Sequence, residues 1–156
     1  PGERLLQAGD MLTLDFGGFC QGYASDMTRT VAIGEASQQL RDLYAKLLDA
    51  QQYGVEQVRA GIRCAELDRL VRERLRKYDL DQYFAHGTGH GLGLEVHESP
   101  SVSSRSEWVL QEGMVITVEP GVYIPGWGGI RIEDSVIVKS SGCEVITKAP
   151  KQLIVI

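Results

Sequence analysis

Three carboxylates interrupt apolar, strand-like segments of the sequence. Asp15 follows MLTL, Glu119 follows MVITV, and Glu133 lies within IRIEDSVIV. An ionised carboxylate removed from water is costly unless it is paired with a cation, protonated or bound to a metal ion. Arg131 lies two residues from Glu133 on the same strand face and predicts one ion pair, whereas Asp15 and Glu119 have no basic neighbour in the sequence. A metal ion would satisfy all three acids, while for any one of them the simpler alternative is a strand-end residue that faces water.

The three histidines of the chain, His86, His90 and His97, all lie within the segment HGTGHGLGLEVHE. The glycines of this segment allow a close approach of backbone and ligand, or else they mark β-bulges in a twisted sheet. Strict alternation places His90 and His97 on opposite faces, so both can serve one site only if the strand bends. Asp26 in GYASDMTRT is a weaker candidate, because an Asx-turn would also explain it. Acids and histidines together favour a carboxylate-rich dinuclear metal site.

Other chemistries lack their motifs. The sequence contains no GxSxG elbow, no GxxxxGK[ST] phosphate loop and no HExxH pair. Cys20, Cys64 and Cys143 are far apart and form no CxxC, so we expect buried, apolar cysteines rather than disulfides or a thiolate zinc site. An iron site with two histidines, His86 and His90, and one glutamate is an alternative, but it leaves the other acids unexplained.

Length and composition predict one acidic domain. The chain has 156 residues, a net charge of −5 and 43% apolar residues, which is enough to form a core. An acidic balance without a basic stripe argues against nucleic acid as a partner. No apolar run reaches the ~18 residues of a membrane span, and the first residues do not resemble a signal peptide. These features favour a cytoplasmic protein that does not bind a membrane.

Periodicity predicts the elements that position these residues. Two strands, 11–16 and 28–33, precede a helix from Ser37 to about Val58, for which Ser37 is the expected N-cap. A second amphipathic helix has its apolar face at positions 67, 70, 71, 75 and 78. Short strands then follow the Gly/His segment, at 114–118, 122–124, 130–138 and 144–146. The order ββααβββ predicts an α+β domain with helices on one face of an antiparallel sheet.

Four blocks of the sequence together resemble the metallopeptidase family of aminopeptidase P, prolidase and methionine aminopeptidase, which share the pita-bread fold. The blocks are, in order, DFGGFCQGYASDMTRT, HGTGHGLGLEVHESP, GMVITVEPG and GIRIEDSVIV. Within the family, EPGVYIPG and HGLGLEVHE look like the bacterial Xaa-Pro peptidase branch. The resemblance implies a peptidase that hydrolyses the bond between an N-terminal residue and proline, acting on peptides with proline in the second position.

The same resemblance implies a ligand set for two divalent ions, consisting of Asp15, Asp26, His90, Glu119 and Glu133. Asp26 and Glu133 would bridge the two ions. Four carboxylates and one imidazole form a hard ligand set, for which Mn²⁺ is the first choice and Co²⁺, Fe²⁺ or Zn²⁺ are alternatives.

The resemblance also implies the roles of four residues. A metal-bridging hydroxide would attack the scissile carbonyl, with Glu119 accepting and passing on its proton. His97 would stabilise the tetrahedral oxyanion, and His86 would line the substrate pocket. Arg131 would orient the acids and relay protons.

The chain departs from the family's pattern at its start. The family's catalytic domain includes an earlier α/β segment with a further active-site histidine, and here only fourteen residues precede Asp15. We therefore expect residues 1–156 to be the C-terminal part of the catalytic domain, with an incomplete fold and without an N-terminal domain. Strand edges left unpaired in such a piece predict a homodimer. Two alternatives are a methionine aminopeptidase-like peptidase and a non-catalytic pita-bread module that binds proteins.

Overall fold

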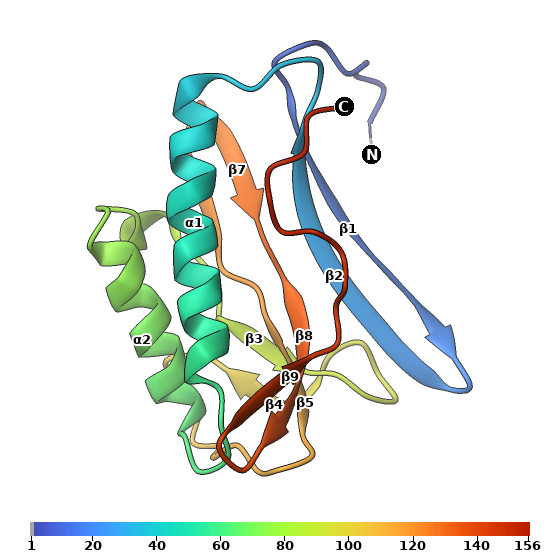
Figure 1. The fold of residues 1–156 in the computed structure, drawn as a ribbon, viewed down its shortest axis with the longest axis vertical. Helices are drawn as coiled ribbons and strands as arrows, with labels where there is room; N and C mark the ends of the chain where they lie inside the picture. Colours follow the sequence, from blue (N-terminus) through green and yellow to red (C-terminus); the bar gives the residue numbers. More distant parts are fainter. Residues whose placement is uncertain (1) are drawn as a thin grey trace.

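The computed structural model describes residues 2–156, which form two helices packed against antiparallel strands. Figure 1 shows α1 and α2 side by side on one side of the central strands, with the long β1–β2 ribbon on the other side. The elements, in chain order, are β1 (Met11–Cys20), β2 (Tyr23–Ala32), α1 (Gln38–Gln57), α2 (Cys64–Arg76), a 3₁₀ turn (Asp81–Tyr83), β3 (Gly89–Gly91), β4 (Glu98–Val102), β5 (Val115–Val118), β6 (Gly121–Ile124), β7 (Gly128–Arg131), β8 (Asp134–Lys139) and β9 (Gly142–Val145).

Strands β1 and β2 form a two-stranded antiparallel ribbon that is longer than predicted. Both strands continue to a tight turn, where Gln21 and Gly22 have φ angles of 51° and 86°. Positive φ at both central residues is typical of the type I′ turns that close hairpins. Asp15 is opposite Thr28 and Gly17 is opposite Asp26, so the side chains of Asp15 and Asp26 share one face of the ribbon. Asp26 therefore lies within a strand and not in an Asx-turn.

The remaining strands form a five-stranded sheet and a separate β6–β7 hairpin. The order in the sheet is β4-β3-β5-β8-β9, with antiparallel neighbours. The prediction of one continuous strand over 130–138 is wrong, because Arg131 pairs with Gly121 in the hairpin whereas Asp134 pairs with Val118 in the sheet. Strand β4 was not predicted, since its sequence ESPSV lacks an apolar alternation.

The two ladders break at the same level. On one side the chain leaves the sheet at Glu119 and Pro120, and Pro120 has no N–H to donate to a ladder. On the other side it passes between ladders at Ile132 and Glu133. Two of the predicted ligand acids, Glu119 and Glu133, therefore lie near each other and outside the regular strand pairing.

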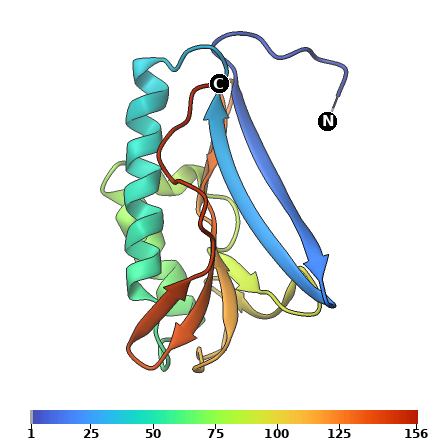
Figure 2. The ribbon, with the colours of Figure 1, turned by 45° about the vertical axis from the view of Figure 1, so that its right-hand side comes forward.

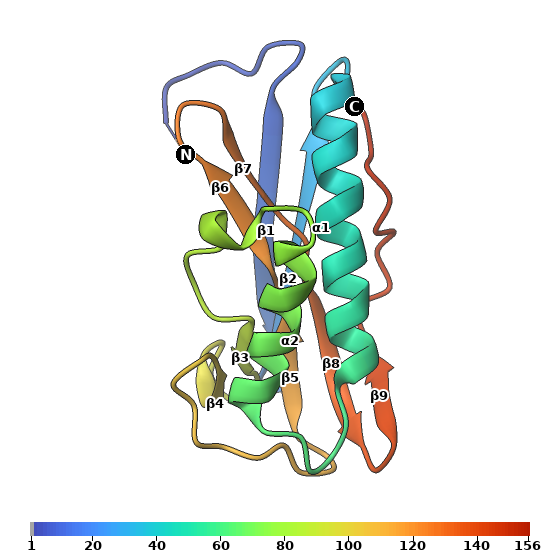
Figure 3. The ribbon, with the colours of Figure 1, turned by 90° about the vertical axis from the view of Figure 1, so that its left-hand side faces the viewer.

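The helices form as the apolar periodicity predicts. The Ser37 hydroxyl accepts a hydrogen bond from the backbone N–H of Leu40 at 3.2 Å, which confirms Ser37 as the N-cap of α1. Figure 3 shows both helices in front of the strands, and Leu47 of α1 packs in one core cluster with Val122 and Ile130. The α+β architecture with helices on one face is confirmed.

The turn end of the β1–β2 ribbon is exposed at the surface. Figure 2 shows the turn end of the ribbon extending away from the helices. Leu14 and Phe16 on β1 are exposed. Cys20 is exposed too, which corrects the prediction for this cysteine, whereas Cys64 is buried as predicted and Cys143 is partly buried. Cys20 is exposed because it lies at the end of β1, beside the hairpin turn. Among the described residues, neither helix is both long and apolar enough to cross a membrane.

Candidate metal centre

Residues from five separate segments converge at the break between the two ladders. Three overlapping groups of acids and histidines have potential ligand atoms that all lie within 4.8 Å of one another inside each group. The groups are Asp15, Asp26 and Glu133; His90, Glu119 and Glu133; and Asp26, His90 and His97. All five ligands that the resemblance implies are therefore brought together, and His97 lies beside them.

Glycines and a bend place His90 and His97 at this point. A Cβ atom at Gly89 would lie 2.0 Å from the carbonyl oxygen of Thr117, and one at Gly91 would lie 2.3 Å from that of Ser99. The β3–β4 register also shifts between His90 and Gly91, so the segment combines close backbone approach with a bulge. The chain then bends back, and the rings of His90 and His97 lie with their centroids 4.2 Å apart. The bend that both histidines need in order to serve one site is present.

Glu133 is buried with half of its carboxylate unsatisfied. Glu133 is 1% exposed, and its Oε2 accepts a hydrogen bond from the Thr28 hydroxyl at 2.6 Å. Its Oε1 has no partner among the described residues. Burial, and then the nearby charges of Glu119, Asp26 and Asp15, raise the pKa of Glu133 to about 8. A buried acid among other acids with one free oxygen suits a bound cation.

The ring of His90 is oriented as a metal ligand would need, with Nε2 directed at the acids. A carbonyl oxygen can only accept, so Nδ1–H of His90 donates to the Gly91 carbonyl at 3.0 Å. Its Nε2 then faces Glu119 Oε1 at 3.1 Å and Asp26 Oδ2 at 3.5 Å. Burial alone would lower the pKa of His90, but the hydrogen bond with Glu119 and the other contacts raise it to about 8. In the metal-free protein the imidazolium therefore acts as a cation for these acids.

Thr117 supports two of the site residues at once. Its hydroxyl accepts a hydrogen bond from the backbone N–H of His90 at 3.0 Å and donates one to Glu119 Oε1, also at 3.0 Å. The backbone N–H of Glu119 donates to the Thr88 carbonyl at 2.8 Å. Burial alone would raise the pKa of Glu119, but its hydrogen bond with His90 lowers it, so this acid is held as a carboxylate.

Arg131 pairs with Asp15 and not with Glu133. Its guanidinium forms an ion pair with the Asp15 carboxylate, and its Nε lies 3.8 Å from Glu119 Oε2. The predicted ion pair with Glu133 is wrong because the chain changes ladder between the two residues, which directs Arg131 toward the ribbon. Among the described residues, Arg131 is the one arginine or lysine within 4.0 Å of any acid of the site.

Tyr123 links Arg131 to His86. Arg131 Nη1 donates to the phenol oxygen of Tyr123 at 3.1 Å, and the phenol lies 3.0 Å from His86 Nε2. Nδ1–H of His86 donates to the Gly87 carbonyl at 2.8 Å, so the neutral ring offers Nε2 as an acceptor and Tyr123 donates to it. The sequence reasoning missed Tyr123, for which the available signal was a phenol four residues after Glu119 in EPGVYIPG. Thr28 and Thr117 were also missed.

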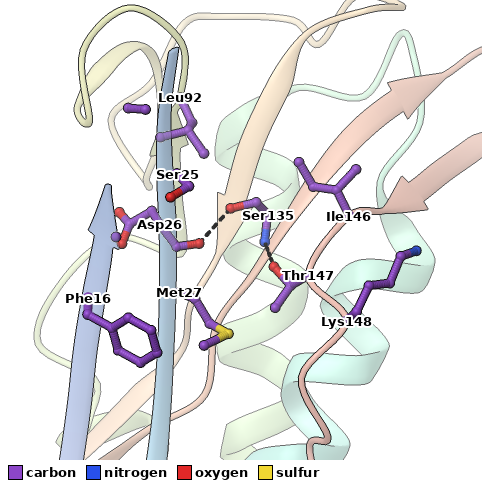
Figure 4. A pocket seen from close by; sticks show the side chains of 11 residues that line it. Phe16, Ser25, Asp26, Met27, Leu92, Ser135, Ile146, Thr147 and Lys148 are labelled. Carbon is purple, nitrogen blue, oxygen red and sulfur yellow. Dashed lines mark hydrogen bonds between the residues drawn. The ribbon is translucent and has the colours of Figure 1, made fainter. Parts of the chain in front are cut away.

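The site opens into a cleft of about 370 Å³. Its lining residues with polar side chains are Asp15, His86, His90, His97, Ser101, Ser103, Glu119 and Arg131. A second cavity of about 470 Å³, shown in Figure 4, lies where Phe16 and Met27 of the ribbon face Ile146. There the backbone carbonyl of Asp26 accepts a hydrogen bond from the Ser135 hydroxyl at 2.9 Å, on the side away from the Asp26 carboxylate. The polar cleft is therefore the one that carries the candidate chemistry.

Comparison with known proteins gives the family. The model of metallopeptidase family M24 matches residues 1–140. The chain belongs to this family. It is 42% identical to the Xaa-Pro dipeptidase of Pyrococcus furiosus over 152 residues, which are 97% of this chain and 44% of that protein. It also matches the structure of the Xaa-Pro dipeptidase from Bacillus anthracis with a TM-score of 0.96 and 51% identity, and that of the X-Pro aminopeptidase from Thermotoga maritima with a TM-score of 0.96 and 39% identity. Each structural match covers 99% of this chain and 44% of the other.

The M24 chain thus spans less than half the length of the relatives it matches. Within the family it falls in the Xaa-Pro dipeptidase or prolidase branch, and its fold is the corresponding portion of the pita-bread fold. The family implies a divalent metal ion. The donor set fits one, because it is rich in carboxylates, has one imidazole with Nε2 directed at the acids, and includes the unpartnered Oε1 of Glu133.

Proposed function

We propose that this M24 chain is the C-terminal part of the catalytic domain of an Xaa-Pro dipeptidase, which cleaves peptides after an N-terminal residue that precedes proline. One observation carries the proposal: four carboxylates and His90 meet at one point beneath an open polar cleft. Glu133 is buried among three other acids, so a negative charge on its carboxylate is costly in the metal-free state, where its pKa is raised to about 8. Two divalent cations, with Mn²⁺ as the first choice, would neutralise it.

The cations would be held by the five implied ligands, with Asp26 and Glu133 shared between them. Asp26, Glu133 and His90 each belong to two of the three ligand groups, and of these residues the two acids have a second carboxylate oxygen with which to bind a second ion, which supports Asp26 and Glu133 as the bridging pair. When bound, divalent ions at such a site lower the pKa of water and polarise a peptide carbonyl. The carboxylates are hard ligands suited to Mn²⁺, Co²⁺ or Fe²⁺.

The other residues of the cleft would bind, orient and move protons. Glu119 is held as a carboxylate by His90 and Thr117, so it can accept the proton of the attacking water and pass it to the leaving amine. His97 lies at the exposed edge beside His90, where its ring can donate to the oxyanion of the tetrahedral intermediate. His86, Tyr123 and Arg131 form a hydrogen-bonded series that fixes the His86 ring at the wall of the substrate pocket.

Two other functions of the same fold predict different results. An aminopeptidase that acts on longer peptides, or one specific for N-terminal methionine, would use the same ligand set with a different pocket. A non-catalytic module that binds proteins would have no need of a complete ligand set. The complete ligand set argues against the non-catalytic module. The 51% identity to the Xaa-Pro dipeptidase from Bacillus anthracis, against 39% to the X-Pro aminopeptidase from Thermotoga maritima, favours the dipeptidase.

The test is hydrolysis by the full-length protein after loading with Mn²⁺. Ala-Pro and Met-Pro dipeptides would be compared with Ala-Pro-Ala and with Met-Ala-Ala, and Ala-Ala would serve as the control without proline. Preferred cleavage of the Xaa-Pro dipeptides is expected. Preference for Ala-Pro-Ala would assign an aminopeptidase, preference for Met-Ala-Ala a methionine aminopeptidase, and metal binding without hydrolysis a non-catalytic module.

A homodimer is the expected assembly. Strand β1 pairs only with β2 among the described strands, so the backbone of its other edge has no strand partner, and the exposed Leu14 and Phe16 lie on the face of the ribbon opposite Asp15. Long unpaired edges with apolar side chains associate readily. Light scattering of the 156-residue chain measures the state directly, and a monomer would contradict this part of the proposal.

A further inference from the structure

We propose that a buried cluster on the helix side of the metal centre, formed by Arg29, Gln51, Asp134 and Lys151, positions Glu119 and Glu133 for cation binding. None of these four side chains belongs to the implied ligand set. The inference rests on the proposed metal-dependent function and concerns what places the two acids.

Asp134 is the centre of the cluster. It directly follows Glu133 and begins β8, so the two side chains point to opposite sides: Glu133 toward the ribbon and Asp134 toward α1. Asp134 is fully buried. Its Oδ1 accepts from Arg29 Nη2 at 2.9 Å, and its Oδ2 accepts from Gln51 Nε2 at 2.9 Å and lies 2.5 Å from Lys151 Nζ. Both carboxylate oxygens of Asp134 are therefore held on the side of β8 that faces away from the metal centre.

Arg29 connects this cluster to the backbone of Glu133. Its Nη1 donates to the carbonyl oxygens of Thr28 and Glu133. The backbone N–H of Glu133 donates in turn to the Thr28 carbonyl at 3.1 Å, and the Thr28 hydroxyl holds the Glu133 carboxylate. The peptide groups on either side of Glu133 lie in the gap between β7 and β8, where no ladder fixes them. The Arg29 guanidinium therefore holds these peptide groups in place of ladder hydrogen bonds.

Gln51 extends the same cluster to Glu119. It lies on α1 and is fully buried, and its Nε2 also lies 3.3 Å from the carbonyl oxygen of Val118, the residue before Glu119. The Gln51 amide thus contacts both the Val118 carbonyl, next to Glu119, and the Asp134 carboxylate, next to Glu133. This contact couples the ends of β5 and β8 at the level where the metal centre is built.

Lys151 brings the C-terminal segment into the cluster. Its Nζ contacts Asp134 and donates to Gln51 Oε1 at 3.2 Å, and its backbone carbonyl accepts from the Tyr44 hydroxyl at 2.9 Å. Arg29 also donates to the carbonyls of Ala149 and Pro150, each at 2.9 Å. The segment that follows β9 therefore acts on the ligands through Asp134, although it contributes no ligand.

The test uses the full-length protein with two variants and a matched control. Asp134→Asn keeps the shape of the side chain and removes its charge, and Lys151→Met removes a cation from a partly exposed side chain and serves if the first variant does not fold. The control is Asp49→Asn, which breaks the ion pair with Arg74, whose Nε lies 2.6 Å from Asp49 Oδ2 between α1 and α2. Metal-free protein would be titrated with Mn²⁺ by calorimetry, and the visible spectrum of the Co²⁺ form would report the ligand geometry.

Both cluster variants should bind Mn²⁺ about 10-fold more weakly than the wild type and shift the Co²⁺ absorption bands, as expected for residues that orient ligands. Asp49→Asn should lower the melting temperature while leaving the affinity and the bands unchanged. The inference is overturned if Asp134→Asn or Lys151→Met lowers the melting temperature but keeps the wild-type affinity and spectrum. If the wild type itself binds no Mn²⁺, the proposed function fails, and this inference fails with it.

Discussion

The Thr28 hydroxyl holds one carboxylate oxygen of Glu133 at 2.6 Å and leaves the other oxygen without a partner. The two residues are 105 positions apart in the sequence. This bond fixes one oxygen of the buried carboxylate and leaves the other available to a cation, so it orients Glu133 for cation binding.

Thr28→Val should therefore weaken metal binding. Valine keeps the shape of threonine but cannot donate, so the buried carboxylate loses its one fixed oxygen, and the affinity for Mn²⁺ should fall about 10-fold. Calorimetric titration measures the effect. Thr13→Val is the control, since the Thr13 hydroxyl contacts only Thr30 on the same ribbon. An equal loss of affinity in both variants would show that general loosening of the ribbon, and not the bond to Glu133, is responsible.

The full-length protein should bind two Mn²⁺ or Co²⁺ ions per chain, because the five implied ligands include two acids that can be shared. Asp26→Asn should weaken the binding of both ions, whereas Asp15→Ala should weaken the binding of one. Elemental analysis and titration check the stoichiometry. Asp10→Asn is the matched control, because Asp10 pairs with Arg4 and belongs to none of the ligand groups. Saturation at one ion in the wild type would contradict a dinuclear site.

Glu119 and His97 should differ in what their loss costs. Glu119→Gln keeps the shape but removes a base and an anionic ligand, so turnover should collapse. His97→Ala should retain both ions and lower kcat by roughly 10²–10³, the typical loss of one oxyanion donor. Steady-state kinetics with metal analysis separates the two. Loss of metal from His97→Ala would make this residue a ligand instead, as its group with Asp26 and His90 would allow.

Tyr123→Phe should reduce kcat through His86. The variant keeps the ring and removes the hydroxyl that links His86 to Arg131, so the His86 ring loses its fixed orientation. A decrease in kcat of about 10-fold is expected from the loss of one positioning hydrogen bond. Tyr78→Phe, which removes a bond to Asp49 far from the cleft, should leave the kinetics unchanged. Wild-type kinetics for Tyr123→Phe would show that the Tyr123 hydroxyl is not needed to position His86 for catalysis.

The metal-free protein should become less stable as the pH rises from about 5 to about 8. The pKa of Glu133 is raised from 4.5 to about 8, so the folded state keeps a proton that the unfolded state releases in this window, and its stability falls with pH. The pKa of His90 is raised from 6.5 to about 8, so the stability that its imidazolium contributes below pH 6.5 is also lost as the pH rises through 8.

Thermal melting of the metal-free protein at several pH values tests this pH dependence. Mn²⁺ affinity should change in the opposite direction and rise with pH, because the ligands must release protons before they bind. Glu133→Gln should flatten the melting profile, since the amide does not titrate. A melting temperature that rises between pH 5 and pH 8 in the metal-free wild type would show that the two shifts have been assigned the wrong sign.

The sequence predicts the local structure better than it predicts the contacts of the site. Ser37 and the apolar spacing of α1 act over a few residues, so they were visible in the sequence. The pairing of Arg131 with Asp15 depends on how the hairpin meets the ribbon, 116 positions away, and proximity in sequence suggested Glu133 instead. The ligand set came from four ordered sequence blocks and not from periodicity. Thr28 carried no local signal because its role arises only from register and packing, and the position of Tyr123 after Glu119 does not reveal its contacts with His86 and Arg131.

Asp15 is the one implied ligand on β1, a strand whose residues beyond Leu12, Asp15 included, are exposed. Its neighbour Asp26 lies on β2, which is already fixed to β8 through Ser135. A cation bound by Asp15, Asp26 and Glu133 would thus join the outer strand to β2 and to the junction between β7 and β8, whereas in the metal-free protein Asp15 is held by its ion pair with Arg131 instead. Amide hydrogens of β1 should then exchange faster in the metal-free protein than those of β2, and the outer strand would be the first part of the fold to open.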